Sequence, residues 1–146
     1  MKPEINFYQV DETIIKSLAP LLLKVLEEKK KALIFCKEQN QVREIDSSLW
    51  SYGRNKFIPH VTNSDREFIF ERQPILISDK EENLNKADYL VFLSDVSEGF
   101  ATGFSRIFYF FEPHNSAAAK ILAKKFQPLS SKFNSYEKKD GKWVKV

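Results

Sequence analysis

Residues 32–50, ALIFCKEQNQVREIDSSLW, decide the fold class of this chain. The first five, ALIFC, form an unbroken apolar run of strand length, which is typical of a strand buried on both faces. In the segment that follows, QNQVREIDSSLWS (39–51), apolar side chains recur every three or four residues and therefore share one face of a helix. These side chains are Val42, Ile45 and Leu49. A buried strand followed by an amphipathic helix is the repeating unit of a parallel α/β sheet.

The alternation continues on both sides of this stretch. INFYQV (5–10) favours a strand, and DET (11–13) is a capping signal for a helix that runs to about Lys31. Pro20 must lie in the first turn of that helix or mark a kink, because proline has no backbone N–H to donate. The apolar face of the same helix consists of Leu18, Leu21, Leu22 and Val25. Three more strand candidates are PILIS (74–78), ADYLVFLS (87–94) and RIFYFFE (106–112).

Two further elements complete the pattern. A helix is expected over about 115–127, and Asp140-Gly141 is a hairpin signal between two short strands near the C-terminus. Together the elements predict an α/β fold, a three-layer sandwich with a mostly parallel central sheet and helices on both faces. We find no internal repeat and no linker, so a single domain over 1–146 is expected.

Composition narrows the class of protein. Hydrophobic residues make up 42% and charged residues 29%, as in an ordinary globular domain, and the formal net charge is only +3. A single cysteine, Cys36, excludes a disulfide framework within the chain. No apolar run approaches the ~20 residues of a membrane span, and the first residues have the pattern of folded sequence. We therefore expect a cytoplasmic protein.

Nucleotide-binding and catalytic patterns are missing from the sequence. A dinucleotide site needs glycines at the first strand-to-helix turn, and here that turn reads QVDETII. The architecture is thus Rossmann-like without a phosphate site, and we expect no cofactor. Cys36 lies within an apolar strand, whereas a nucleophilic cysteine needs exposure. His60 and His114 each follow a proline, and two histidines fall short of a zinc site. We expect no catalytic residue and no metal ligand.

The stretch WSYGRNKFIPH (50–60) carries large apolar groups where a polar loop is expected. Trp50 lies about 80° from the centre of the helix's apolar stripe, so it is predicted to be about half exposed. With Phe57 and Ile58 it either closes the core or forms an apolar surface that contacts a partner. The residues alone leave both interpretations open.

Several segments, in order, resemble the chi subunit of bacterial DNA polymerase III: ALIFC, EIDSSLW, KFIPH, PILIS, FYFFEP, a late helix with AKK, and GKW. The most specific elements are a (D/E)-x-x-LW helix end and an F-x-PH motif. They comprise Asp46, Leu49, Trp50, Phe57, Pro59 and His60. The resemblance implies a non-catalytic accessory protein with a Rossmann-like fold. It also implies that the protein joins the clamp loader through the psi subunit, with the contact at Trp50, Phe57, Ile58 and Pro59.

The same resemblance implies a second partner, the acidic, Phe-ended C-terminal tail of single-stranded DNA-binding protein. Its site maps to the late helix, where Lys120 and Lys124 form an i,i+4 pair on one face. Lys124 stands where the family has arginine, and Gln127 occupies the register of an aromatic residue. Phe126, one residue earlier, points about 120° away, so it serves the tail pocket only if the last turn distorts.

Three alternatives remain open from the sequence. The chain could bind single-stranded DNA directly, through the lysines of KKDGKWVK (138–145) with Trp143 and Tyr136 as stacking rings. It could instead be an enzyme of the nucleotide-binding α/β class. Where no psi subunit exists, the Trp50 surface would meet another clamp-loader or replisome protein.

Overall fold

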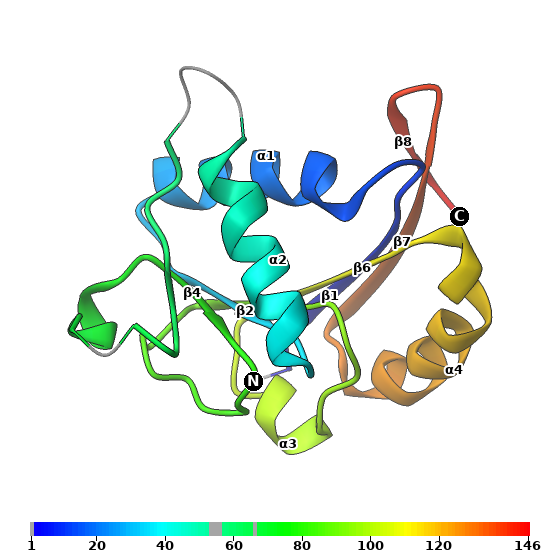
Figure 1. The fold of residues 1–146 in the computed structure, drawn as a ribbon. Helices are drawn as coiled ribbons and strands as arrows, with labels where there is room; N and C mark the ends of the chain where they lie inside the picture. The colour runs from blue at the N-terminus through cyan, green and yellow to red at the C-terminus, as the bar shows by residue number, and fades with distance from the viewer. Residues whose placement is uncertain (1, 53–56, 66) are drawn as a thin grey trace.

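The computed structural model describes residues 2–52, 57–65 and 67–146, and within them eight strands form one sheet (Figure 1). The strands are β1 (Glu4–Gln9), β2 (Ala32–Phe35), β3 (Val61–Thr62), β4 (Ile75–Ser78), β5 (Tyr89–Phe92), β6 (Arg106–Phe111), β7 (Lys132–Lys139) and β8 (Lys142–Lys145). Their order across the sheet is β3-β4-β2-β5-β6-β1-β7-β8. Neighbouring strands are parallel except β7 and β8, which form the hairpin expected at Asp140-Gly141.

Helices cover both faces of this sheet. They are α1 (Ile14–Glu27), α2 (Gln39–Trp50), α3 (Glu98–Ala101) and α4 (Ser116–Phe126), with short 3-10 turns at η1 (Phe70–Arg72), η2 (Pro113–Asn115) and η3 (Gln127–Leu129). Figure 1 shows α1 and α2 on one side and α3 and α4 on the other. Each side has its own cluster of buried apolar side chains. Along β2 successive residues alternate between the clusters, since Leu33 and Phe35 belong to one and Ala32 and Ile34 to the other.

The predicted α/β fold with a mostly parallel, helix-covered sheet is confirmed. The strand order is not the 3-2-1-4-5-6 order of the classic dinucleotide-binding fold, because β1 lies between β6 and β7. The turn from β1 into α1 contains no glycine, as the sequence indicates.

Element boundaries differ from the sequence prediction mainly in α1. Pro20 lies in the second turn of α1 and not in the first, and its side chain is exposed. The helix ends at Glu27 and not near Lys31, because Lys29 adopts a left-handed conformation with φ 58°. The N–H of Lys29 bonds to Leu26 O and that of Lys30 to Val25 O, which is the Schellman pattern of a helix end.

Two negative findings apply to the described ranges. Among residues 2–52, 57–65 and 67–146, no helix combines the length and apolar character required to cross a membrane. In the same ranges no group of three or more His, Cys, Asp or Glu side chains is arranged to hold a metal ion.

Candidate partner-docking surface

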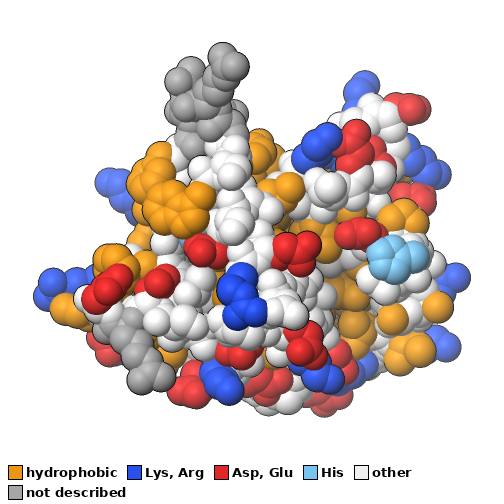
Figure 2. Space-filling view, in the orientation of Figure 1, with side chains coloured by type: hydrophobic (Ala, Val, Ile, Leu, Met, Phe, Trp, Pro, Cys, Tyr) orange, Lys and Arg blue, Asp and Glu red, His pale blue; other side chains and the backbone are white. Residues whose placement is uncertain are grey.

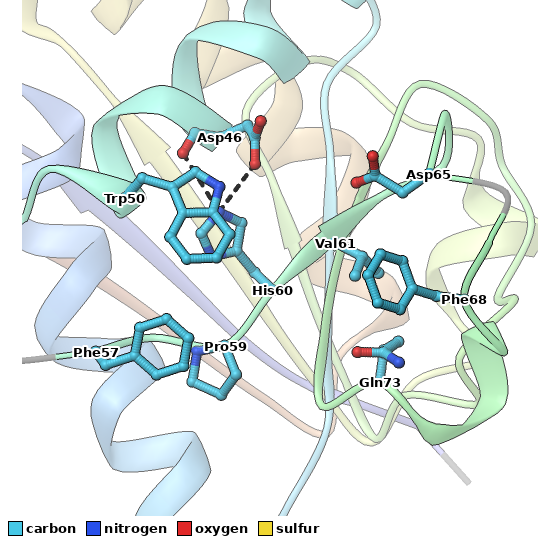
Figure 3. Close-up of a pocket in the computed structure, with 9 residues that line it drawn as sticks. All are labelled: Asp46, Trp50, Phe57, Pro59, His60, Val61, Asp65, Phe68 and Gln73. Atoms are coloured by element: carbon cyan, nitrogen blue, oxygen red, sulfur yellow. Dashed lines mark hydrogen bonds and ion pairs between the residues drawn. The ribbon is translucent and has the colours of Figure 1, made fainter.

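An apolar hollow of about 320 Å³ opens where α2 ends beside the edge strand β3 (Figure 3). Trp50 is the last residue of α2, and Phe57 and Pro59 come from the segment that leads into β3. Phe68, from the connection between β3 and β4, forms the opposite wall. The remaining lining residues are Asp46, His60, Val61, Asp65 and Gln73. We call Trp50, Phe57, Pro59 and Phe68 the Trp50 surface.

The aromatic side chains of this surface are strongly exposed. Trp50 is 58% exposed, Phe57 65% and Phe68 45%, and the rings of Trp50 and Phe57 lie 5.6 Å apart between centroids. Next to Phe68, Ile69 is also 58% exposed. Figure 2 shows a hydrophobic patch on the viewer's side beside the C-terminal end of α2. Exposed aromatic residues gathered in this way are typical of sites that contact another protein.

The local backbone explains which residues point outward. Val42, Ile45 and Leu49 are buried as predicted, and this turns the neighbouring Trp50 to the edge of the helix. In the extended segment after the helix, side chains alternate, so Phe57 points outward while Ile58 and His60 point inward. Ile58 is 1% exposed and packs in the core. Its assignment to the partner surface is therefore wrong. Residues 53–56 lie outside the described residues.

The imidazole ring of His60 packs against the indole ring of Trp50. Its ring centroid lies 4.6 Å from that of Trp50, and its side chain is fully buried. Nδ1 lies 2.7 Å from the carbonyl oxygen of Ile58. Nε2 lies 2.9 Å from Oδ1 of Asp46 and 3.3 Å from the backbone carbonyl oxygen of the same residue (Figure 3). A carbonyl oxygen only accepts, and so does an ionised carboxylate. An acceptor oxygen thus lies within hydrogen-bonding distance of each ring nitrogen, and these two contacts fix the orientation of the imidazole.

The other wall is held by a tight turn. The carboxylate of Asp65 accepts hydrogen bonds from the backbone N–H of Thr62 at 2.8 Å and from its hydroxyl at 3.2 Å. Asp46 and Asp65 thus place carboxylates on two sides of the hollow.

The residues predicted to bind the acidic tail separate into two groups. Lys120, Lys124 and Gln127 are exposed, whereas Phe126 is fully buried against Phe92 in the core. Phe126 therefore cannot line a tail pocket. The helical spacing in the sequence already indicated that Phe126 points away from the tail site, and the last turn of α4 does not distort enough to change this direction.

A groove of about 160 Å³ lies between α4 and β7, and Lys120 lies on its border. Its apolar walls are formed by Phe7, Phe111, Ala119, Ala123 and Val146. Lys124 does not line this groove. The neighbouring Lys125 is bound elsewhere, to a carboxylate oxygen of Asp95 at 3.1 Å and to the carbonyl oxygen of Val96 at 3.0 Å.

Sequence reasoning missed residues at both sites. Phe68 and Ile69 belong to REFIFE (66–71), where an apolar run interrupts a polar segment. That run was the feature of the sequence that could have indicated an exposed apolar contact. Phe7 and Phe111 line the groove although they lie on strands, and no signal in the sequence distinguishes them from other core phenylalanines. Only the arrangement of β1, β6 and β7 beside α4 brings them together.

The side chains considered for catalysis have structural surroundings. Cys36 is buried, and burial raises the pKa of its thiol to about 12, which disfavours the nucleophilic thiolate. The ring nitrogens of His60 contact the carbonyl oxygen of Ile58 and the carboxylate of Asp46. His114 is exposed at η2, with Nδ1 3.6 Å from a carboxylate oxygen of Glu112.

The family model described as "DNA polymerase III chi subunit, HolC" matches residues 1–130. A protein of Rickettsia prowazekii (strain Madrid E) named "Probable DNA polymerase III subunit chi" is 31% identical over 88 residues, which are 60% of this chain and 52% of that protein. "DNA polymerase III subunit chi" of Haemophilus influenzae (strain ATCC 51907 / DSM 11121 / KW20 / Rd) is 37% identical over 82 residues, 56% of each chain. The chain thus spans about half the length of these curated relatives. The resemblance seen in the sequence is confirmed, and the chain belongs to the DNA polymerase III chi subunit family.

Proposed function

We propose that this chain is a non-catalytic accessory subunit of a bacterial DNA polymerase III assembly. In this role it is an adaptor with two contacts. The Trp50 surface docks the psi subunit or another clamp-loader protein, and the groove beside Lys120 binds the acidic C-terminal tail of single-stranded DNA-binding protein. Membership of the chi subunit family supports the replication role.

The observation that carries the proposal is the exposed aromatic Trp50 surface, supported by the buried ring of His60. Trp50 and Phe57 expose more than half of their side chains, and each would bury its ring on docking. Full burial of such a side chain contributes about 1.5–3 kcal/mol. Because the indole already rests on His60, less side-chain freedom is lost on binding.

Capture by purified clamp-loader subunits tests the first contact. The double variant Trp50→Ala with Phe57→Ala should lose at least about thirtyfold in affinity, since truncation of central aromatic residues costs at least about 2 kcal/mol. Ile121→Ala is the matched control, because Ile121 is 71% exposed on α4, away from the Trp50 surface. Equal capture of the double variant and the control would contradict the assignment.

The second contact combines charge with an apolar groove. Lys120 provides a cation at the border, and the walls are apolar side chains that suit the terminal phenylalanine of the tail. An exposed ion pair contributes only about 0.2–1 kcal/mol, so burial of the phenylalanine must supply most of the affinity. Charge would orient the tail and accelerate its capture.

Calorimetric titration with an acidic peptide that ends in phenylalanine tests this contact. We expect salt-sensitive binding that weakens about two- to fivefold in Lys120→Ala and changes less in Lys124→Ala, which does not line the groove. Lys30→Ala, an exposed lysine just beyond α1, is the control. A peptide that releases no heat at low salt, or that binds Lys120→Ala as well as wild type, would refute the site.

A further inference from the structure

A cluster of aromatic rings lies on the side of the sheet that carries α1, at the hairpin of β7 and β8. Tyr8 stacks on Tyr136 with centroids 5.1 Å apart and planes 13° apart, and on Phe110 at 5.1 Å. The indole of Trp143 meets Tyr8 edge-on at 5.0 Å and is 37% exposed. Figure 1 shows the hairpin extending beyond the rest of the sheet. Trp143 therefore forms the outer end of an ordered aromatic stack.

A hollow of about 320 Å³ opens between this stack and α1. Trp143, Tyr8 and Phe110 form one wall, and Ser17, Pro20, Leu21 and Lys24 of α1 form the other. The volume is roughly ten times the ~30 Å³ that one water molecule occupies in the liquid, which leaves room for a planar ring. The exposed Pro20 ring takes part in this wall, so the proline within α1 contributes a flat apolar surface.

The segment that carries the hairpin is the basic part of the chain. Residues 132–146 contain five lysines against Glu137 and Asp140, a net charge of +3, which equals the net charge of the whole chain. The other 131 residues are therefore formally neutral in total. Lys138 places its ammonium 5.1 Å from the centre of the Trp143 ring, and Lys145 pairs with Tyr136 across the hairpin on the same face.

We propose that this surface binds single-stranded nucleic acid, with a base stacked at Trp143 and phosphates contacted by Lys24, Lys138 and Lys145. Stacking rings interleaved with lysines are the recurrent elements of such sites. An acidic peptide would use the lysines but offers no planar groups at regular intervals for the aromatic stack. The inference does not rest on the proposed function, and the hairpin lies beyond residue 130, where the match to the family model ends.

Fluorescence anisotropy of a labelled oligo-dT with the purified full chain tests the proposal. Wild type should bind at low salt, and Trp143→Ala should bind about fivefold to a hundredfold more weakly, as expected for the loss of one stacked base. Lys138→Ala with Lys145→Ala should reduce the slope of log K against log salt by about 1.4, since each contact to a single strand contributes about 0.7. The matched control is Lys37→Ala with Lys80→Ala, which removes the same charge from exposed lysines that follow β2 and β4 and should leave the affinity within about twofold of wild type.

Two further readouts keep the test decisive. In a Trp50→Phe background only Trp143 fluoresces as tryptophan, and oligo-dT should quench it, whereas polyglutamate of equal charge should not. Polyglutamate should also displace oligo-dT poorly. No binding at low salt would overturn the proposal, and so would equal losses in the two double-lysine variants. Displacement by polyglutamate as efficient as by unlabelled oligo-dT would show an acidic-peptide surface instead.

Discussion

The imidazole of His60 lies between the carboxylate of Asp46 and the carbonyl oxygen of Ile58, directly against the exposed indole of Trp50. A buried polar group is tolerated only when it is hydrogen-bonded, and here each ring nitrogen lies within hydrogen-bonding distance of an oxygen atom. Asp46 is 31% exposed, so water still screens part of the pair. His60 therefore works as a positioning residue, which fixes the indole without contacting a partner itself.

Replacement of His60 by alanine should be costly. It removes the contacts of the ring with Ile58 and Asp46 and the ring that packs against Trp50, and we expect a loss of about 2–4 kcal/mol in the free energy of unfolding. Denaturation in urea measures the loss. His114→Ala is the control, because His114 is exposed and its contact with Glu112 should contribute less than about 0.5 kcal/mol. Equal stability of the two variants would contradict the role of His60.

The thiol of Cys36 should be inert in the folded protein. Burial raises its pKa from 9.0 to about 12, so at pH 8 the native chain holds almost no thiolate. The unfolded chain releases this proton at lower pH than the folded chain. The thiol's contribution to stability is therefore complete below about pH 9 and is lost as the pH rises toward 12. A thiol reagent at pH 8 should react far faster in denaturant than in buffer, and equal rates would show that Cys36 is accessible.

At the scale of elements, the end of α1 shows a local conflict between sequence and conformation. The Schellman pattern places its left-handed residue at Lys29, where glycine is usual. A side chain in this conformation costs about 1 kcal/mol, which the packing of α1 and β2 offsets.

Lys29→Gly should therefore stabilise the protein by up to about 1 kcal/mol, after the greater backbone freedom of glycine in the unfolded chain is subtracted. The matched control is Lys30→Gly, at a neighbouring residue without a positive φ, and it should be neutral or destabilising. Thermal denaturation compares the two variants. A lower melting temperature for Lys29→Gly than for Lys30→Gly would contradict this account.

Elements whose apolar residues follow a clear pattern were predictable from the sequence. The apolar stripe of α2 and the runs of β2, β4, β5 and β6 each carry enough residues for a pattern to emerge. Strand β3 has only two residues, so it shows no period, and its pairing with β4 is a long-range event. Strand order depends on the same kind of distant contact, and for that reason the place of β1 between β6 and β7 was not predictable.

The candidate sites were predictable only in part. Helix geometry placed Trp50 at the edge of the apolar stripe, and the structure exposes it. Ile58 was misassigned because its orientation follows from an extended backbone, whose alternation could not be located without neighbouring strands. Phe68 reaches the Trp50 surface through the connection between β3 and β4, and no local pattern encodes where such a connection folds.

At the scale of the whole molecule, the two proposed contacts lie at opposite ends of the sheet. The Trp50 surface adjoins β3, the first strand in spatial order, and the Lys120 groove adjoins β7, the seventh. Six strand spacings of about 4.8 Å separate these strands by roughly 29 Å. Partners bound at the two sites should therefore not compete, and occupancy of one should change the affinity of the other by less than about twofold. Calorimetry with the tail peptide, with and without a saturating docked partner, measures this coupling, and strong competition would contradict the separation.

Simultaneous bridging tests the adaptor role most directly. Beads that carry an acidic, Phe-ended tail peptide are incubated with the purified chain and then with clamp-loader subunits, and the retained subunits are quantified. We predict that wild type retains them, that Lys120→Ala retains less of both the chain and the subunits, and that Trp50→Ala with Phe57→Ala keeps the chain on the beads but loses the subunits. Failure of wild type to retain any clamp-loader subunit, or undiminished retention by the Trp50→Ala, Phe57→Ala variant, would contradict the account.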